Sequence, residues 1–361
     1  MYASNPADLQ LNKLSTLLKQ QFPFLRTDTL QRVEDVIRAL IEKQTSNQRL
    51  LATALPGTAS PEGKRKRLSR CIRDEQLDDD FFLQFLLSLL PSGKLVVTLD
   101  RTNWEYGEQS VNLLVLGVVL EGFTLPLVWT VLGHGGSSDT MTREKLVTRL
   151  LKRLPAVRWK ALVADREFVG YLWFAFLRKR RIRRAIRIRA DTIVDEMRVD
   201  EWFGHVQVGK WHTLLEKAWV YRSVMQVVAT RSADGELVVI ATDLSIWEVW
   251  AVYRMRWSIE CTFSSLKRRG FDLERSAMTM ADHLGRFFGL LTMAWVWCLR
   301  IGTWLKDWKP IEIKKHGRPA MSVLTYGWEF LANAVRWDEQ RTAQCCALLS
   351  LPFPPPGQPK C

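Results

Sequence analysis

The pattern of apolar and polar residues changes from a helical period to a strand period at about residue 94. Before that point, apolar side chains recur every three or four residues at Val33, Val36, Ile37, Leu40 and Ile41. This spacing predicts a helix with one buried face. A second helix is predicted over 47–55, with Ser46 as its N-cap and Pro56-Gly57 after its end. Residues 1–90 are therefore predicted to be a helical domain that contains a candidate helix-turn-helix.

Short apolar and β-branched runs, separated by turn residues, predict strands over 94–99, 111–120 and 124–132. Four elements are then predicted in the order helix, strand, helix, strand, over 140–154, 161–164, 170–178 and 185–189. Residues 190–245 contain mostly short alternating or β-branched runs, which predict further strands over 198–202, 204–208, 218–220, 226–230 and 236–242. The chain is thus predicted to be an α/β protein.

Composition and charge narrow the kind of partner. The chain has 361 residues, 47% of them hydrophobic, which is enough for two or three domains with a sizeable core. A net charge of +14 indicates a polyanionic partner, with a membrane surface as the competing explanation. The most apolar stretch, 287–299, has 13 residues, fewer than the ~20 that span a bilayer, so it is predicted to be a buried helix. Residues 1–12 are polar and contain no apolar run, so no signal peptide is expected there.

The cysteines and histidines do not indicate a metal centre. The six cysteines form no C-x-x-C pair, and the five histidines supply no zinc spacing. His205 and His212 lie seven residues apart in a predicted β region, which does not favour a structural zinc. A reduced, cytoplasmic protein without a membrane segment is expected.

Four polar side chains in the C-terminal half of the chain share one face of a predicted helix: Tyr253, Arg256, Glu260 and Lys267. At ~100° per residue they fall within an arc of about 60°. Apolar residues occupy a second face of the same segment: Val252, Met255, Ile259, Phe263 and Leu266. A solvated charged face is the ordinary explanation of such a stripe, although a tyrosine beside an arginine is unusual on one.

Two aspartates follow predicted strands. Asp100 comes after 94–99, and Asp165 comes after 161–164. Either residue alone is typical of a turn or a helix cap. Together with Glu260 they form a candidate metal-binding trio, because hard divalent cations prefer oxygen ligands.

Three sequence strings carry a family resemblance: LVVTLDRTNWEYG at 95–107, ALVADREF at 161–168 and YRMRWSIECTFSSLKRRG at 253–270. With these strings, the chain resembles bacterial insertion-sequence transposases of the DDE type. The resemblance is to the family named after insertion sequence four and marked by a YREK signature. It covers roughly residues 30–335, and the string KKHGRP at 314–319 is similar to the C-terminal region of that family.

The resemblance implies a domain organisation. A ribonuclease-H-like catalytic core, with a mixed five-stranded sheet and flanking helices, is expected, together with an inserted β-rich domain that folds over the active site and an N-terminal helical domain. An N-terminal DNA-binding domain is expected over 1–90, the first part of the core over 91–189 and the insertion over 190–245. The core helix with Glu260 and the C-terminal helices are expected over 246–335, and a tail over 336–361.

The resemblance also implies the chemistry. Asp100, Asp165 and Glu260 would hold two Mg²⁺ ions, for which Mn²⁺ is a substitute. Tyr253, Arg256 and Lys267 would contact the terminal DNA strand near the cleavage site. A tryptophan of the insertion would stack on a flipped base, and the candidates are Trp202, Trp211 and Trp219.

Basic residues are densest just before the insertion. Eight of the twelve residues from Arg178 to Arg189 are Lys or Arg. In the predicted strand 185–189 the two-residue period places Arg187 and Arg189 on one face and the isoleucines on the other. This separation of charged and apolar faces favours a sheet edge that binds along DNA phosphates over a face that is only solvated.

The hypothesis that joins these features is a DNA transposase. It would bind the inverted-repeat ends of an insertion sequence, nick them by metal-assisted hydrolysis, and transfer the 3′-OH ends to target DNA as a homodimer in a paired-end complex. Two alternatives remain: a DNA-binding descendant that no longer cuts, and a ribonuclease-H-like nuclease without strand transfer. The enzyme would act in the bacterial cytoplasm, on nucleoid DNA.

Overall fold

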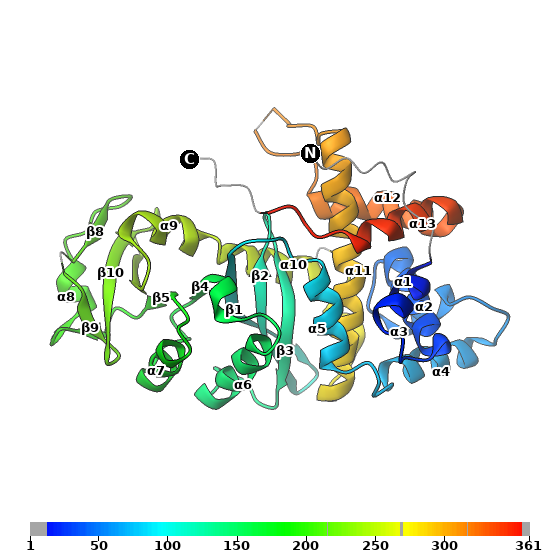
Figure 1. Cartoon of the computed structure of the whole chain (residues 1–361), viewed down its shortest axis with the longest axis horizontal. Coiled ribbons are helices and arrows are strands. Elements are labelled where there is room, and N and C mark those ends of the chain that lie inside the picture. The colour runs from blue at the N-terminus through cyan, green and yellow to red at the C-terminus, as the bar shows by residue number, and fades with distance from the viewer. Residues whose placement is uncertain (1–12, 215, 268–269, 316, 356–361) are drawn as a thin grey trace. The chain divides into compact units, whose positions relative to one another are not determined.

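The computed structural model describes residues 13–355 apart from 215, 268–269 and 316. The chain forms two compact units. One combines the N-terminal residues through Pro91 with Trp104–Val111 and Phe263–Pro354, and the other contains Ser92–Asn103 and Asn112–Thr262. Helices dominate the first unit and a large mixed sheet dominates the second (Figure 1).

The helical unit has five N-terminal helices and three C-terminal ones among its described residues. They are α1 (Leu14–Gln21), α2 (Thr27–Lys43), α3 (Gln48–Ala54), α4 (Pro61–Ile72), α5 (Asp79–Ser88), α11 (Ala281–Trp308), α12 (Val323–Trp337) and α13 (Glu339–Ala347). Their amphipathic faces meet around α11, whose residues from Phe287 to Gly302 are all buried.

Helix α11 is long and apolar enough to cross a membrane by length and composition alone, but 78% of its most apolar window is buried in the fold. It therefore serves as the core helix of this unit, as predicted for 287–299. Helix α12 packs closely against it, because Gly327 faces the carbonyl of Cys298 and the backbone of Gly302 without an intervening side chain. The N-terminal helices join this core where Trp328 Nε1 donates a 2.9 Å hydrogen bond to the Ile41 carbonyl.

Two N-terminal details differ from the predictions. Asn47, not Ser46, caps α3, because its side chain accepts hydrogen bonds from the amides of Arg49 and Leu50. The Ser46 hydroxyl instead donates to the carbonyl of Asp272. The segment 336–361, predicted as a tail, contains α13, whose Cys345 and Cys346 are buried.

The second unit is built on one mixed sheet. Its strands are β1 (Leu95–Tyr106), β2 (Gln109–Val119), β3 (Thr124–Leu132), β4 (Trp159–Ala164), β5 (Arg184–Ile188), β6 (Ile193–Val194), β7 (Met197–Arg198), β8 (Trp211–Thr213), β9 (Ala218–Val220), β10 (Ser223–Arg231) and β11 (Leu237–Thr242). They are ordered β3-β2-β1-β4-β5-β11-β10-β9-β6-β7, with β8 paired to β10. Strands β1, β4 and β5 run parallel.

The predicted five-stranded sheet is therefore only part of a larger one. Strand β11 pairs antiparallel with β5, and β10 pairs with β11, so the segment 190–245 continues the core sheet. One predicted strand of this segment, 198–202, is instead largely the short helix α8 (Val199–Phe203). The predicted strand 204–208 is also not formed, apart from an isolated bridge at Val208, whereas 218–220, 226–230 and 236–242 correspond to β9, β10 and β11.

Helices cover both faces of this sheet. Helix α6 (Thr140–Leu151) connects β3 to β4, and α7 (Tyr171–Lys179) connects β4 to its parallel neighbour β5. Helix α9 (Ile246–Arg254) packs on the opposite face from α7 (Figure 1), with Val249, Val252 and Tyr253 against Val163 and Ala185. This packing holds the end of α9 over the carboxyl ends of the parallel strands.

Candidate active site

Asp100 and Asp165 lie side by side. Strands β1 and β4 pair in parallel with Leu99 opposite Ala164, and the two aspartates are the next residues on these neighbouring strands. The structure corrects one detail, because β1 does not end at Leu99 but continues through Asp100 to Tyr106. The two side chains still interact electrostatically, since parallel register places equivalent residues next to each other.

The Asp100 side chain is 15% exposed, and that of Asp165 is 32% exposed. Burial raises the pKa of Asp100 to about 7, although the Arg101 amide, 2.8 Å from Oδ1, and the Arg256 guanidinium act to lower it. Asp165 Oδ1 is buried and accepts no hydrogen bond from the described residues. The nearest cation to it is Arg187, whose Nη1 lies 3.9 Å away. This pair of carboxylates is therefore short of positive charge.

Arg256 joins Asp100 to Glu260. Its Nη1 lies 3.5 Å from Asp100 Oδ2, and its Nη2 lies 2.7 Å from Glu260 Oε1. Burial acts to lower the pKa of Arg256, but its interactions with Tyr253, Asp165, Glu260 and Asp100 raise it overall. The guanidinium is the cation that neutralises two of the three predicted ligands.

The four helix-phased residues do not lie on one helix, so that prediction was wrong. Tyr253 belongs to α9, Arg256 to the turn after it, and Glu260 to α10 (Trp257–Lys267). Three-residue hydrogen bonds form this joint, from the Arg256 amide to the Tyr253 carbonyl and from the Ile259 amide to the Arg256 carbonyl. The tighter turns end the ideal α-helical phase, and they bring Arg256 to Asp100.

The side chains of Tyr253 and Lys267 are both more buried than those of a solvent-exposed helix face. Tyr253 is 7% exposed, and burial raises its pKa to about 12, so the phenol is neutral. Lys267 ends α10 and belongs to the helical unit, where its Nζ lies 3.0 Å from Glu274 and 5.7 Å from the centre of the Trp104 ring.

The predicted phosphate-following edge at 185–189 is not an edge. Strand β5 lies between β4 and β11, so its backbone is paired on both sides. Arg187 points toward carboxylates rather than solvent, with Nη2 2.7 Å from Glu236, and only 13% of its side chain is exposed. Arg189 lies beyond the strand and is exposed. The inserted strands convert the predicted edge into the interior of the sheet.

An ion pair that the sequence patterns did not predict lies next to the two aspartates. Arg101 Nε lies 2.9 and 2.8 Å from the two carboxylate oxygens of Glu167, and both side chains are 23% exposed. Arg143, which is buried, donates to the Glu167 carbonyl at 3.2 Å and lies over the Phe168 ring. The signal was present, since Arg101 directly follows Asp100 and Glu167 lies two residues after Asp165.

The three candidate tryptophans have different environments. Trp202 Nε1 donates to the Val194 carbonyl at 2.9 Å. Trp211 is 38% exposed, and its ring centre is 4.2 Å from that of Trp250. Trp219 is 59% exposed. Two of the three, Trp211 and Trp219, therefore present ring surface to solvent.

The carboxylates are of the ligand type that a divalent cation prefers, although Arg256 forms ion pairs with two of them. No group of three His, Cys, Asp or Glu side chains in the described ranges is close enough to hold a metal ion. The donor set contains only oxygen, which suits Mg²⁺ or Mn²⁺, and the buried Asp165 Oδ1 still lacks a hydrogen-bond donor. Asp100 and Asp165 would hold the ion, and Glu260 would join them when Arg256 releases it.

Together these features define a mixed α/β protein with an acidic site where the parallel strand β4 ends beside β1. The chain belongs to the transposase DDE domain family, whose model matches residues 91–297, more than half of the chain. It is thus a DNA transposase of the DDE class. The family implies an enzyme that cleaves and transfers DNA, and its members generally use divalent metal ions.

No curated protein matches the chain in sequence. A cryo-EM structure of a piggyBac transposase synaptic complex with hairpin DNA is similar with a TM-score of 0.44 and 10% sequence identity, over 94% of this chain and 79% of that chain. A similarity at this level does not define the fold.

Proposed function

We propose that this transposase moves an insertion sequence by cut-and-paste transposition, and that it belongs to the group marked by the YREK signature. The active residues would be Asp100, Asp165 and Glu260, in a ribonuclease-H-like core. The strand order β3-β2-β1-β4-β5 with crossover helices α6 and α7 supports this core. The observation that carries the proposal is the pairing of Asp100 with Asp165 at neighbouring strands, linked to Glu260 through Arg256.

When bound, divalent ions would polarise the phosphoryl group for in-line displacement at phosphorus. The protein's own residues would position the DNA. A DNA phosphate near the carboxylates competes with them for Arg256, because a guanidinium binds phosphate as well as carboxylate in a two-pronged geometry. The released guanidinium would then hold the terminal strand, and the neutral Tyr253 would stay packed beneath it.

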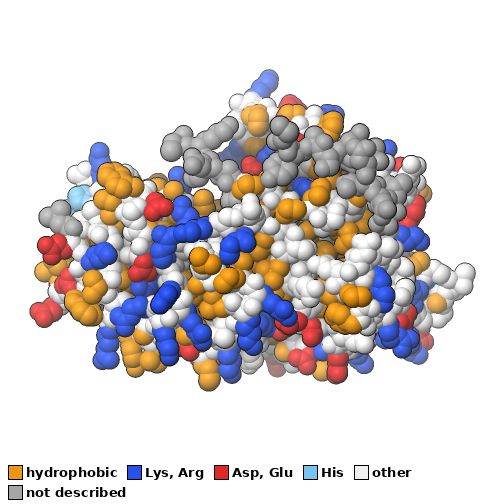
Figure 2. All heavy atoms as spheres, viewed as in Figure 1, with side chains coloured by type: hydrophobic (Ala, Val, Ile, Leu, Met, Phe, Trp, Pro, Cys, Tyr) orange, Lys and Arg blue, Asp and Glu red, His pale blue; other side chains and the backbone are white. Residues whose placement is uncertain are grey.

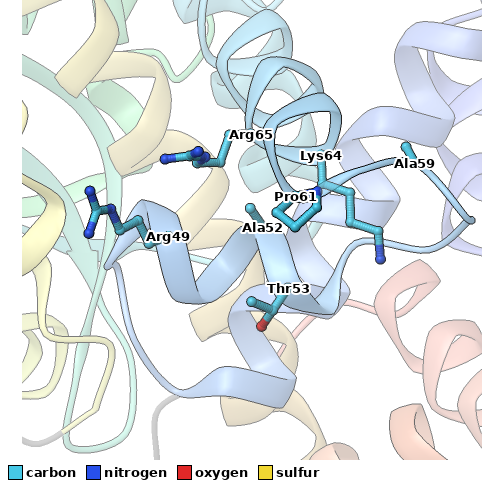
Figure 3. Close-up of a pocket in the computed structure, with 7 residues that line it drawn as sticks. All are labelled: Arg49, Ala52, Thr53, Ala59, Pro61, Lys64 and Arg65. Atoms are coloured by element: carbon cyan, nitrogen blue, oxygen red, sulfur yellow. The ribbon is translucent and has the colours of Figure 1, made fainter.

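The N-terminal helices offer a separate DNA-binding surface. A hollow of about 380 Å³ lies between α3 and α4, with Ala52 and Pro61 among its lining residues. Figure 3 shows Arg49 from α3 and Arg65 from α4 extending to the same side of this hollow. Lys64 adds a third cation to its lining. Such a concave basic surface suits the phosphate backbone of the inverted-repeat end.

The proposal also covers base stacking, assembly of the enzyme and its location in the cell. Trp211 and Trp219 are the best candidates for stacking on a flipped base, because their rings are exposed. A homodimer would hold two transposon ends together. The reaction would take place in the bacterial cytoplasm.

The test is Mg²⁺-dependent nicking and joining on a labelled duplex that carries the DNA next to this gene. Asp100→Asn, Asp165→Asn and Glu260→Gln should each abolish both reactions, while Glu201→Gln, an exposed acid on α8, should leave them unchanged. Specific binding without cutting by the wild type would favour the DNA-binding descendant. Cutting without joining would favour a nuclease.

A further inference from the structure

A second basic surface lies in the sheet unit, between α6 and α7. These helices border a hollow of about 420 Å³, whose lining includes Glu144, Lys145, Arg149, Lys152, Phe176 and Arg180. Lys145 in α6 and Lys152 at its C-cap are seven residues apart, or two helical turns, so they form a row ~10 Å long. Arg180 completes the opposite wall from the end of α7, with its guanidinium 5.5 Å from the Phe176 ring centre.

Two of the cations of this groove, Lys145 and Lys152, are not neutralised by any other described residue. Four cations line it against one acid, Glu144. Within the described part of the chain, Lys145 and Lys152 have no ion-pair partner, and both are exposed. Arg149 is the exception among the cations, since it donates to the Trp129 carbonyl at 3.1 Å. Figure 2 shows Lys and Arg side chains gathered at the lower left, the region of α7 and α6 in Figure 1.

Helix chemistry explains only part of this cluster. Cations near a helix C-terminus interact favourably with the helix dipole, which accounts for Lys152 and Arg180. Lys145 lies in the middle of α6, where the dipole gives no such benefit. More exposed cations, Arg178, Lys179 and Arg181, lie next to Arg180. An accumulation of this size carries an electrostatic cost that an anionic partner would remove.

The groove lies away from the carboxylates within the same unit. Helix α6 leads into β4 and α7 leads into β5, so Lys152 and Arg180 approach the amino ends of these strands. Asp100 and Asp165 lie at their carboxyl ends. Strand β4 has six residues, or ~20 Å, which corresponds to about six base pairs of duplex.

We infer that the groove between α6 and α7 binds the backbone of a second stretch of double-stranded DNA, about six base pairs or more from the phosphate at the carboxylates. This inference rests on the proposed function and extends it to DNA outside the cleavage site. Over the ~10 Å between Lys145 and Lys152 a duplex carries about six phosphates, enough to engage Lys145, Lys152 and Arg180. These contacts are with phosphates, so they would be independent of base sequence.

The experiment measures binding of a labelled random-sequence duplex of about 40 base pairs by fluorescence anisotropy over a series of salt concentrations. The variant K145E/K152E is compared with the wild type and with K210E/K217E. The control pair is exposed, lies in the same unit, and changes the net charge equally. Loss of two phosphate contacts should reduce the slope of log K against log salt by about 2 and weaken binding roughly tenfold or more. The control should show a clearly smaller change.

Three results would overturn the inference. Equal losses in the two double variants would show that only net charge matters. A deficit on polyglutamate without one on DNA would assign the groove to an acidic protein segment. No binding of duplex by the wild type would remove the proposed function as well. By contrast, the wild-type protein could fail to nick its own end while K145E/K152E still loses DNA binding. That result would support DNA binding by the groove and contradict only the proposed cutting activity.

Discussion

Arg256 neutralises carboxylates that a metal ion would otherwise neutralise, and its removal should therefore have a defined effect on stability. In Arg256→Gln the contacts at 3.5 Å to Asp100 and at 2.7 Å to Glu260 lose their positive charge. The Glu260 side chain is 36% exposed, so solvent screens its contact and that contact contributes little. Asp100 is 15% exposed, and we expect the loss at this side to be about 1–3 kcal/mol of unfolding free energy.

The loss should depend on pH. The folded-state pKa of Asp100 is raised to about 7, so the folded protein retains this proton at pH values where the unfolded chain has released it. The contribution of Asp100 to stability therefore falls as pH rises from its unfolded pKa through the folded one. Arg256 acts to lower that folded pKa, so its removal extends the fall to higher pH. Below pH 7 Asp100 is protonated in both proteins, and the variant should differ less from the wild type there.

The assay is urea unfolding followed by tryptophan fluorescence, about one pH unit below and above neutrality, with and without Mg²⁺. The matched control is Arg166→Gln, which breaks a 3.0 Å pair with Glu236 between side chains that are 53% and 44% exposed. The control should lose less than about 1 kcal/mol, equally at both pH values. Mg²⁺ should stabilise Arg256→Gln more than the wild type, because it then enters without displacing a guanidinium. A pH-independent loss, or equal stabilisation of both proteins by Mg²⁺, would refute the reasoning.

Other perturbations test the supporting structure. Arg101→Glu and Glu167→Arg should each reduce nicking, and the double exchange should restore part of it; a double variant no better than the singles would contradict a positioning role. Gly327→Ala places a Cβ 2.0 Å from the Cys298 carbonyl oxygen, so denaturation should show a loss of about 3 kcal/mol, and an unchanged midpoint would contradict the close helix packing. Burial raises the pKa of Cys71 to about 12, so a thiol reagent should modify it only after unfolding, and rapid labelling of the native protein would disagree.

Local patterns in the sequence determined much of this protein. Strand runs and turn residues gave β2 to β5 nearly in place, and the acidic residues Asp78 and Asp139 cap α5 and α6. That Asp100 and Asp165 lie next to each other could also be predicted from the sequence. Both aspartates directly follow apolar strand runs, and parallel register brings such residues together. These features depend on neighbours a few residues away, where propensity and periodicity carry information.

Only the tertiary structure decided which charges meet. Sequence periodicity assigned Tyr253, Arg256 and Glu260 to one helical stripe, whereas a turn between α9 and α10 brings Arg256 to Asp100, 156 residues earlier in the chain. Likewise, β11 covers the free side of β5 and turns Arg187 toward Glu236. A buried side chain takes its partner from whatever element the fold packs beside it. That choice depends on contacts between distant segments, which no local pattern in the chain specifies.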